Sequence, residues 1–176
     1  GQVTDGVTVL PALFYVATLG IVYTGLRRYA SRRTLALALT LGLACVPNIL
    51  FWSQQFYAEI PLLYYVVTSS LFLFFYFQRP QLNWLLISAA MAGFATQTKI
   101  EGILLVAVSW AAVALSAIIA ATPAARRRGW AAAGLYAAVI AALYLPWFVF
   151  RHFLAHLPQG LSYWDDGARV LKGLAL

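Results

Sequence analysis

The chain has 176 residues, of which 63% are hydrophobic and 10% are charged, and it carries a formal net charge of +7. Its 12 basic and five acidic side chains cannot cover the surface of a water-soluble domain of this length. The composition therefore excludes a soluble globular protein and predicts an integral membrane protein made of lipid-embedded helices.

Six apolar runs follow one another, each long enough or nearly long enough to cross a bilayer. They cover residues 7–26, 34–52, 61–77, 83–97, 103–121 and 130–150. Helices satisfy their own backbone hydrogen bonds in lipid, and the alternating pattern of a membrane barrel is absent. We expect an all-α fold in which residues 1–176 form a single transmembrane region, a polytopic bundle with about six spans.

Most basic residues follow the first, third and fifth runs: Arg27, Arg28, Arg32, Arg33, Arg79, Arg126, Arg127 and Arg128. Short arginine-rich loops between spans stay on the cytoplasmic side, so we expect a multi-pass protein of the cell membrane with these loops inside. The acidic residues then fall on the outer side: Asp5, Glu59, Glu101, Asp165 and Asp166. Arginine runs also occur on nucleic-acid-binding surfaces, but between apolar spans they act as topology signals, and we expect no nucleic-acid partner.

Two polar stretches are predicted on the outer side, and one of them is residues 98–102. So few residues separate the fourth and fifth runs that they must form a tight helical hairpin with Lys99 and Glu101 at its tip. We expect these two side chains to form an ion pair in which Glu101 holds the ammonium of Lys99. A charged tip at a membrane boundary is either an interface anchor or a working site.

The second polar stretch precedes the third run and contains Gln54, Gln55 and Glu59, with Pro61 in the first turn of the helix. Glu59 alone is explained by its place at the positive end of that helix. Together with the charged hairpin tip, these residues predict a polar site at the mouth of an apolar bundle. Gln54, Gln55 and Glu101 are the supporting residues of this site.

Four short segments, taken in their order along the chain, resemble the sequence pattern of a known family of enzymes. They are Pro47-Asn48, Tyr57-Ala58-Glu59-Ile60-Pro61, the segment 92–102 that ends in Thr-Lys-Ile-Glu-Gly, and Leu145-Pro146-Trp147. The pattern is similar to that of the GT-C membrane glycosyltransferases. Within them it resembles the glycosyltransferase family 39-like branch, which includes the dolichyl-phosphate-mannose protein mannosyltransferases and the aminoarabinose transferases of lipid A.

The resemblance implies a membrane enzyme that moves a sugar from a polyprenyl-phosphate carrier to a glycan, lipid or protein acceptor at the outer face. By this likeness Glu59 matches the family's second acidic position, and Lys99 matches the lysine of its Thr-Lys motif. Chemistry supports both assignments. A fixed lysine offsets the charge that develops on the leaving phosphate, and a carboxylate takes the proton of an acceptor hydroxyl.

One departure from the family pattern concerns its principal catalytic aspartate, which belongs to a large external loop after the first span. Asp5 lies too close to the start of the chain to be assigned to that loop. We therefore expect the sequence to be part of a larger membrane domain, lacking an upstream catalytic loop and downstream spans, and to be inactive alone.

Metal or cofactor chemistry has little support in the sequence. Asp165 and Asp166 have no further ligand at a suitable spacing and are read as part of a solvated loop. Cys45 is the single cysteine and cannot form an internal disulfide. We expect no metal and no cofactor.

Two other classes remain open. A multi-spanning transporter or flippase subunit is the main alternative, although such proteins place charged or broken-helix sites near mid-membrane, whereas the carboxylates here lie at outer ends. A purely structural membrane subunit is the other.

Overall fold

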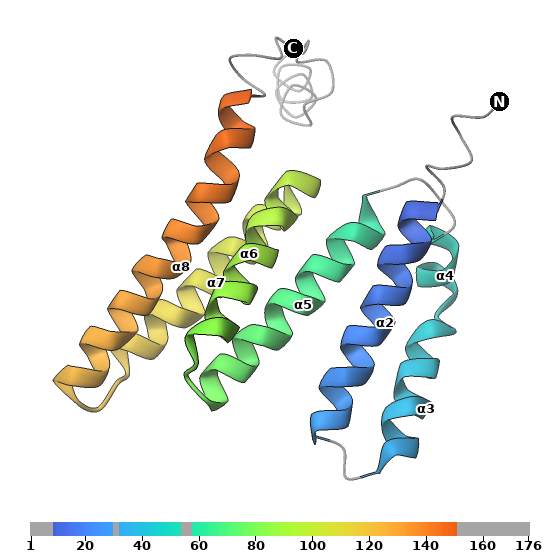
Figure 1. Cartoon of the computed structure of the whole chain (residues 1–176), viewed down its shortest axis with the longest axis horizontal. Coiled ribbons are helices and arrows are strands. Elements are labelled where there is room, and N and C mark those ends of the chain that lie inside the picture. The colour runs from blue at the N-terminus through green and yellow to red at the C-terminus, as the bar shows by residue number, and fades with distance from the viewer. Residues whose placement is uncertain (1–8, 30–31, 54–57, 151–176) are drawn as a thin grey trace, which may run out of the picture. The chain divides into compact units, whose positions relative to one another are not determined.

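The computed structural model describes residues 9–29, 32–53 and 58–150, which form seven helices and, within these ranges, no strand. The all-α prediction is confirmed for this part of the chain. The helices are α2 (Val9–Tyr29), α3 (Arg33–Ala44), α4 (Pro47–Ser53), α5 (Glu59–Gln78), α6 (Leu82–Thr98), α7 (Glu101–Ile118) and α8 (Pro123–Val149) (Figure 1). The chain divides into two compact units, Gly1–Tyr144 and Leu145–Leu176, and the contacts that build the site lie within the first.

Four of the described helices are long and apolar enough to cross a membrane: α2, α5, α7 and α8. Helix α6 has 17 residues and α3 has 12, so both fall short by length. The described residues therefore form a multi-pass protein with four candidate spans, and the expected count of six is not shown.

The second apolar run, residues 34–52, forms two helices instead of one span. Helix α3 ends at Ala44 and α4 begins at Pro47. Proline has no backbone N–H to donate and disfavours the helical conformation at the preceding residue, Val46. The amide of Val46 donates to the carbonyl of Leu43 at 3.2 Å. This bond joins residues three apart, as in a 3₁₀ turn, and the α-helical pattern of bonds between residues four apart ends here.

Helix α6 lies at the centre of the first unit. It packs against α5 and α7, and α5 packs in turn against α2 (Figure 1). The buried face of α6 is built almost wholly of small residues: Ser88, Ala89, Ala92, Gly93 and Ala95, with Leu85. Small side chains allow membrane helices to approach closely. A Cβ at Gly93 would lie 2.9 Å from Cδ1 of Leu143, so α8 also packs closely on this helix.

A buried hydrogen-bond network joins three helices in the middle of the bundle. Ser69 Oγ of α5 donates to the carbonyl of Ser88 at 3.0 Å, and Ser88 Oγ of α6 donates to the carbonyl of Ser69 at 2.9 Å. The hydroxyl of Tyr136 in α8 lies 3.2 Å from Ser88 Oγ. Since each serine has already donated its single proton in this arrangement, Tyr136 is the donor to Ser88.

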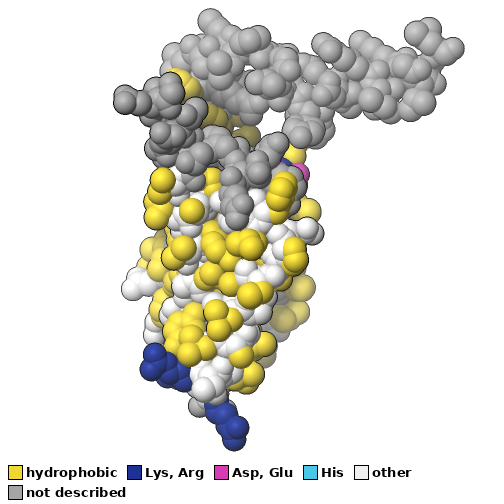
Figure 2. Space-filling view, turned by 90° about the vertical axis from the view of Figure 1, so that its right-hand side faces the viewer, with side chains coloured by type: hydrophobic (Ala, Val, Ile, Leu, Met, Phe, Trp, Pro, Cys, Tyr) yellow, Lys and Arg dark blue, Asp and Glu magenta, His cyan; other side chains and the backbone are white. Residues whose placement is uncertain are grey.

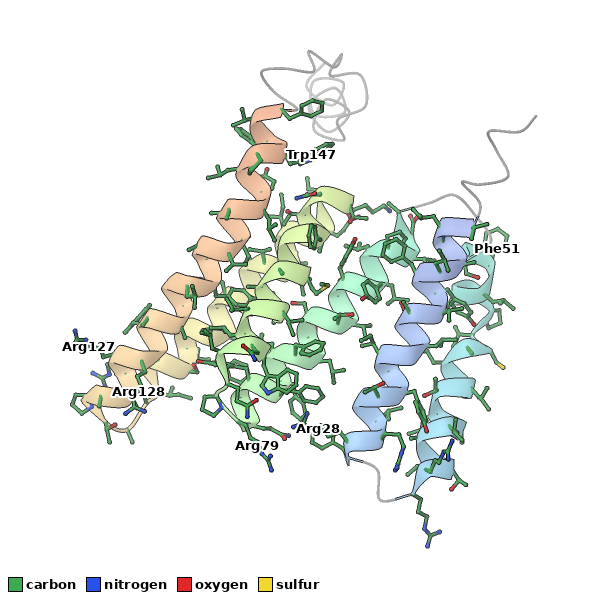
Figure 3. The ribbon with its side chains drawn as sticks, in the orientation of Figure 1. Arg28, Phe51, Arg79, Arg127, Arg128 and Trp147 are labelled. Atoms are coloured by element: carbon green, nitrogen blue, oxygen red, sulfur yellow. The ribbon has the colours of Figure 1, made fainter. Side chains whose placement is uncertain are left out.

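Large apolar side chains cover the outward faces of the helices (Figure 2), among them Leu13, Val16, Leu41, Leu104, Val108 and Leu115. Such faces suit the hydrocarbon of a bilayer. Basic side chains gather at one end, where Figure 3 labels Arg28, Arg79, Arg127 and Arg128. The guanidinium of Arg28 lies 4.6 Å from the ring centroid of Phe75, a distance typical of a cation–π contact.

Candidate functional site

The predicted site residues gather at the end of the bundle opposite to these arginines. Helix α5 begins there, α6 ends there and α7 begins there, as Figure 1 and Figure 3 show together. Glu59 is the first residue of α5, Glu101 is the first of α7, and Lys99 follows the last residue of α6. Gln54 and Gln55 lie outside the described residues, so their place in the site stays a prediction.

The turn between α6 and α7 is a tight hairpin, as the sequence predicts. Lys99 has an extended backbone (φ −152°, ψ 160°), and the amide of Gly102 donates to its carbonyl at 3.0 Å. A Cβ at Gly102 would overlap the carbonyl group of Ala95 and lie 2.6 Å from the nitrogen of Thr96. Glycine is required here because the two helix backbones touch. Sequence reasoning placed Gly102 in the family motif without assigning it this role.

Lys99, at the end of α6, forms an ion pair with Glu59, at the start of α5. Its Nζ lies 2.5 Å from Glu59 Oε1, and the side chains are 28% and 34% exposed. A pair with this much exposure contributes only about 0–1 kcal/mol to stability, so its main effect is to fix where the ammonium lies. The helix ends that carry it are 40 residues apart in the sequence.

The expected ion pair between Lys99 and Glu101 is wrong. Within the described part of the chain the carboxylate partner of Lys99 is Glu59, while Glu101 is exposed. The physical reason lies in the packing of the helices: the turn places Lys99 at the end of α6 beside the start of α5, where the carboxylate of Glu59 is within reach. Glu101 instead places a negative charge in the first turn of α7, where the helix dipole favours it.

The second carboxylate oxygen of Glu59 is notable because Oε2 is buried and has no hydrogen-bond partner among the described residues. Buried polar atoms in proteins are rarely left unpaired. Glu59 therefore offers one oxygen to Lys99 and a second, unused acceptor at the same place.

The last turn of α6 carries three polar side chains with different partners. The hydroxyls of Thr96 and Thr98 donate to carbonyls of their own helix, at 2.6 and 3.1 Å. The amide of Gln97 instead crosses to α8, where Nε2 donates to the carbonyl of Leu143 at 3.0 Å. Gln97 is thus the member of this group that connects the hairpin to another helix.

A metal site is not apparent in residues 9–29, 32–53 and 58–150, where no three histidine, cysteine or acidic side chains lie together. Asp5, Asp165 and Asp166 lie outside these ranges. The expectation of no metal and no cofactor stays a prediction.

A lysine and a carboxylate thus meet at one end of an apolar helical bundle. Both lie on the sequence motifs that resemble the membrane glycosyltransferases. Residues 1–150 match the family model of the dolichyl-phosphate-mannose-protein mannosyltransferases. The chain belongs to this family. The resemblance inferred from its motifs is therefore confirmed, and the matched range includes Glu59, Lys99 and Glu101. Comparisons with curated proteins and with solved structures gave no significant match.

Membership of the dolichyl-phosphate-mannose-protein mannosyltransferase family makes the protein a membrane glycosyltransferase that uses a dolichyl-phosphate sugar donor. This favours the enzyme over the transporter or flippase subunit.

Proposed function

We propose that this glycosyltransferase moves a sugar from a polyprenyl-phosphate-linked donor to a hydroxyl of a glycan, lipid or protein acceptor at the outer face of the membrane. Lys99 contacts the donor phosphate, and Glu59 takes the proton of the acceptor hydroxyl. The observation that carries the proposal is the 2.5 Å contact between these two side chains at one end of the bundle. It puts a cation suited to a phosphate next to a carboxylate, and the hydrogen bond from Lys99 lowers the pKa of Glu59 so that this carboxylate is ionised and able to accept a proton.

The role of Lys99 follows from the charge that moves during transfer. As the bond between the sugar carbon and the phosphate oxygen breaks, its electron pair stays on the lipid phosphate. A fixed ammonium stabilises this charge most where water is partly excluded, as at a helix end bordering lipid. Lysine is a point charge that binds phosphate without the planar geometry of arginine. Holding Nζ on Glu59 Oε1 keeps the long side chain in place before the donor arrives.

The role of Glu59 follows from its second oxygen. The acceptor oxygen forms a new bond to the sugar carbon, and its proton must leave as that bond forms. Oε2 of Glu59 is buried and has no described partner, so it is suited to accept a hydrogen bond from this hydroxyl and then its proton. Gln54 and Gln55 are proposed as further polar contacts for the sugar.

The proposal includes a topology. We infer that α6 and the α3–α4 pair also cross the membrane, which gives six crossings with the four candidate spans. The concentration of arginines at the end away from Glu59 supports an outward-facing site.

Substitution of the charged pair tests the proposal. Lys99→Ala should lower transfer by more than about tenfold, equivalent to roughly 1.4 kcal/mol, because the phosphate loses its counter-charge. Lys99→Arg should keep part of the activity. Glu59→Gln preserves the size of the side chain but removes the base, so it should lower kcat more than it changes donor affinity.

These variants are assayed for sugar transfer in membranes that contain the natural protein or its variants. Arg128→Ala, at the other end of the bundle, is the control and should transfer at the normal rate. Normal donor affinity and normal turnover in Lys99→Ala would reduce the pair to an interface anchor.

A further inference from the structure

The last turn of α6 is held from two sides. On one side Lys99 is paired with Glu59 at the start of α5, and on the other Gln97 donates its amide to the carbonyl of Leu143 in α8 at 3.0 Å. These two contacts are two residues apart in the sequence, and together they tie the end of α6 to α5 and to α8. The position of the ammonium of Lys99 therefore depends on α8 as well as on α5.

Helices α6 and α8 are held together by close packing and by hydrogen bonds. The contact surface on α6 is made of small residues, and a Cβ at Gly93 would already be 2.9 Å from Leu143 Cδ1. Small residues let two membrane helices approach closely, and so they set the distance between α6 and α8. A directional hydrogen bond to one carbonyl selects a single register. Gln97 supplies such a bond at the level of the hairpin, as the hydroxyl of Tyr136 does on Ser88 at mid-bundle.

The position of the acceptor carbonyl gives the bond a second effect. Leu143 lies three residues before Pro146 in α8, and a proline cannot donate to the helical ladder. Membrane helices that contain proline are commonly stabilised by side chains from neighbouring helices, which donate to the backbone near the break. The carbonyl that Pro146 leaves without its helical donor is that of Ala142, and Gln97 restrains α8 at the adjacent carbonyl of Leu143.

We propose that Gln97 is a positioning residue for the transfer reaction, which holds Lys99 at the donor phosphate by anchoring the last turn of α6 to α8. This inference rests on the function proposed above. Gln97 does not touch the reacting groups. Its neighbours Thr96 and Thr98 bond to their own helix and have no such role.

A double-mutant cycle on the complete chain tests whether Gln97 acts through Lys99. Gln97→Met keeps the length of the side chain and removes its N–H donors. Transfer by this variant should fall about three- to tenfold, the range expected for one lost hydrogen bond. In the Lys99→Ala background the same change should cause no further loss, because the group that it positions is gone. Thr98→Val, which removes a bond within α6, is the matched control and should leave transfer unchanged in both backgrounds.

A purely structural role predicts a different result, namely the same fold-loss with and without Lys99. That additive result, or unchanged transfer by Gln97→Met, would overturn the proposal. Should Gln97→Met fail to fold, Gln97→Glu provides a second test, because its ionised carboxylate has the same length and also lacks a donor. Normal transfer by Lys99→Ala would refute the proposed contact between Lys99 and the donor phosphate. Impaired transfer by Lys99→Ala together with an additive cycle would refute only the positioning role of Gln97.

Discussion

Gly102 is the residue on which the geometry of the site depends most directly. Its missing side chain lets the start of α7 touch the backbone of α6 at Ala95 and Thr96. Backbone atoms cannot rotate away as a flexible side chain does. A larger residue here must therefore push the two helices apart and move Lys99, which lies between them.

Gly102→Ala is expected to destabilise the folded protein by about 1–3 kcal/mol, the usual cost of overpacking, and to reduce transfer as well. Thermal unfolding in detergent, followed together with activity, measures both effects. Gly134→Ala is the matched control, since a Cβ at that position in α8 meets nothing within 4 Å. This control should be neutral or gain up to about 1 kcal/mol, because alanine favours a helix more than glycine does. Equal stability of the two variants would contradict the close backbone contact.

At the scale of the helices, the polar contacts between α5, α6 and α8 occur at two levels. One is the hairpin end with Lys99 and Gln97, and the other is the buried network of Ser69, Ser88 and Tyr136. The fully buried side chain of Tyr136 is held by its hydroxyl bond to Ser88. The network therefore fixes the register of the same three helices at mid-bundle, where the packing surface is otherwise made of small residues.

Ser88→Ala removes the hydroxyl that both Ser69 and Tyr136 contact. We expect a loss of about 1–2 kcal/mol in unfolding free energy, since membrane hydrogen bonds are individually modest but Tyr136 would be left unpaired. Ser116→Ala, which removes only a bond to Val113 within α7, should change stability by less than about 0.5 kcal/mol. Equilibrium unfolding in detergent or bicelles compares the two. Equal stability of both variants would mean that the network adds nothing to helix packing.

At the scale of the whole molecule, the two ends of the first unit differ in charge. The labelled arginines lie at one end (Figure 3), and the pair of Lys99 and Glu59 lies at the other. Short arginine-rich loops remain in the cytoplasm, so the proposed site should face outward.

Cysteine labelling tests this orientation without requiring activity. A membrane-impermeant thiol reagent added outside intact cells should modify a cysteine at position 101 and spare one at position 127, both in a Cys45→Ser background. Glu101 suits the probe because it is exposed and is not paired with Lys99 among the described residues. Permeabilised cells provide the control in which both positions react. The reverse pattern would overturn an outward-facing site.

The class of the protein follows from its amino-acid sequence alone. Low charge and long apolar runs require helices in lipid, and the motif around Lys99 and Glu59 predicted the family that residues 1–150 match. The sequence also predicted the tight hairpin, because too few residues separate the two runs for any longer connection. These features are local in the chain, so composition and spacing are enough to fix them.

Which side chains meet depends on how the helices pack against one another. Lys99 pairs with Glu59 rather than with Glu101 because α5 and α6 are adjacent antiparallel helices joined by a short loop, so residues at nearly equal chain distances from that loop lie at the same level. This near-equal spacing of Glu59 and Lys99 about the loop 79–81 is visible in the sequence, but it has meaning only once the two helices are known to pack together. The contact between Gln97 and α8 left no such signal, because it depends on a helix crossing set by small buried residues.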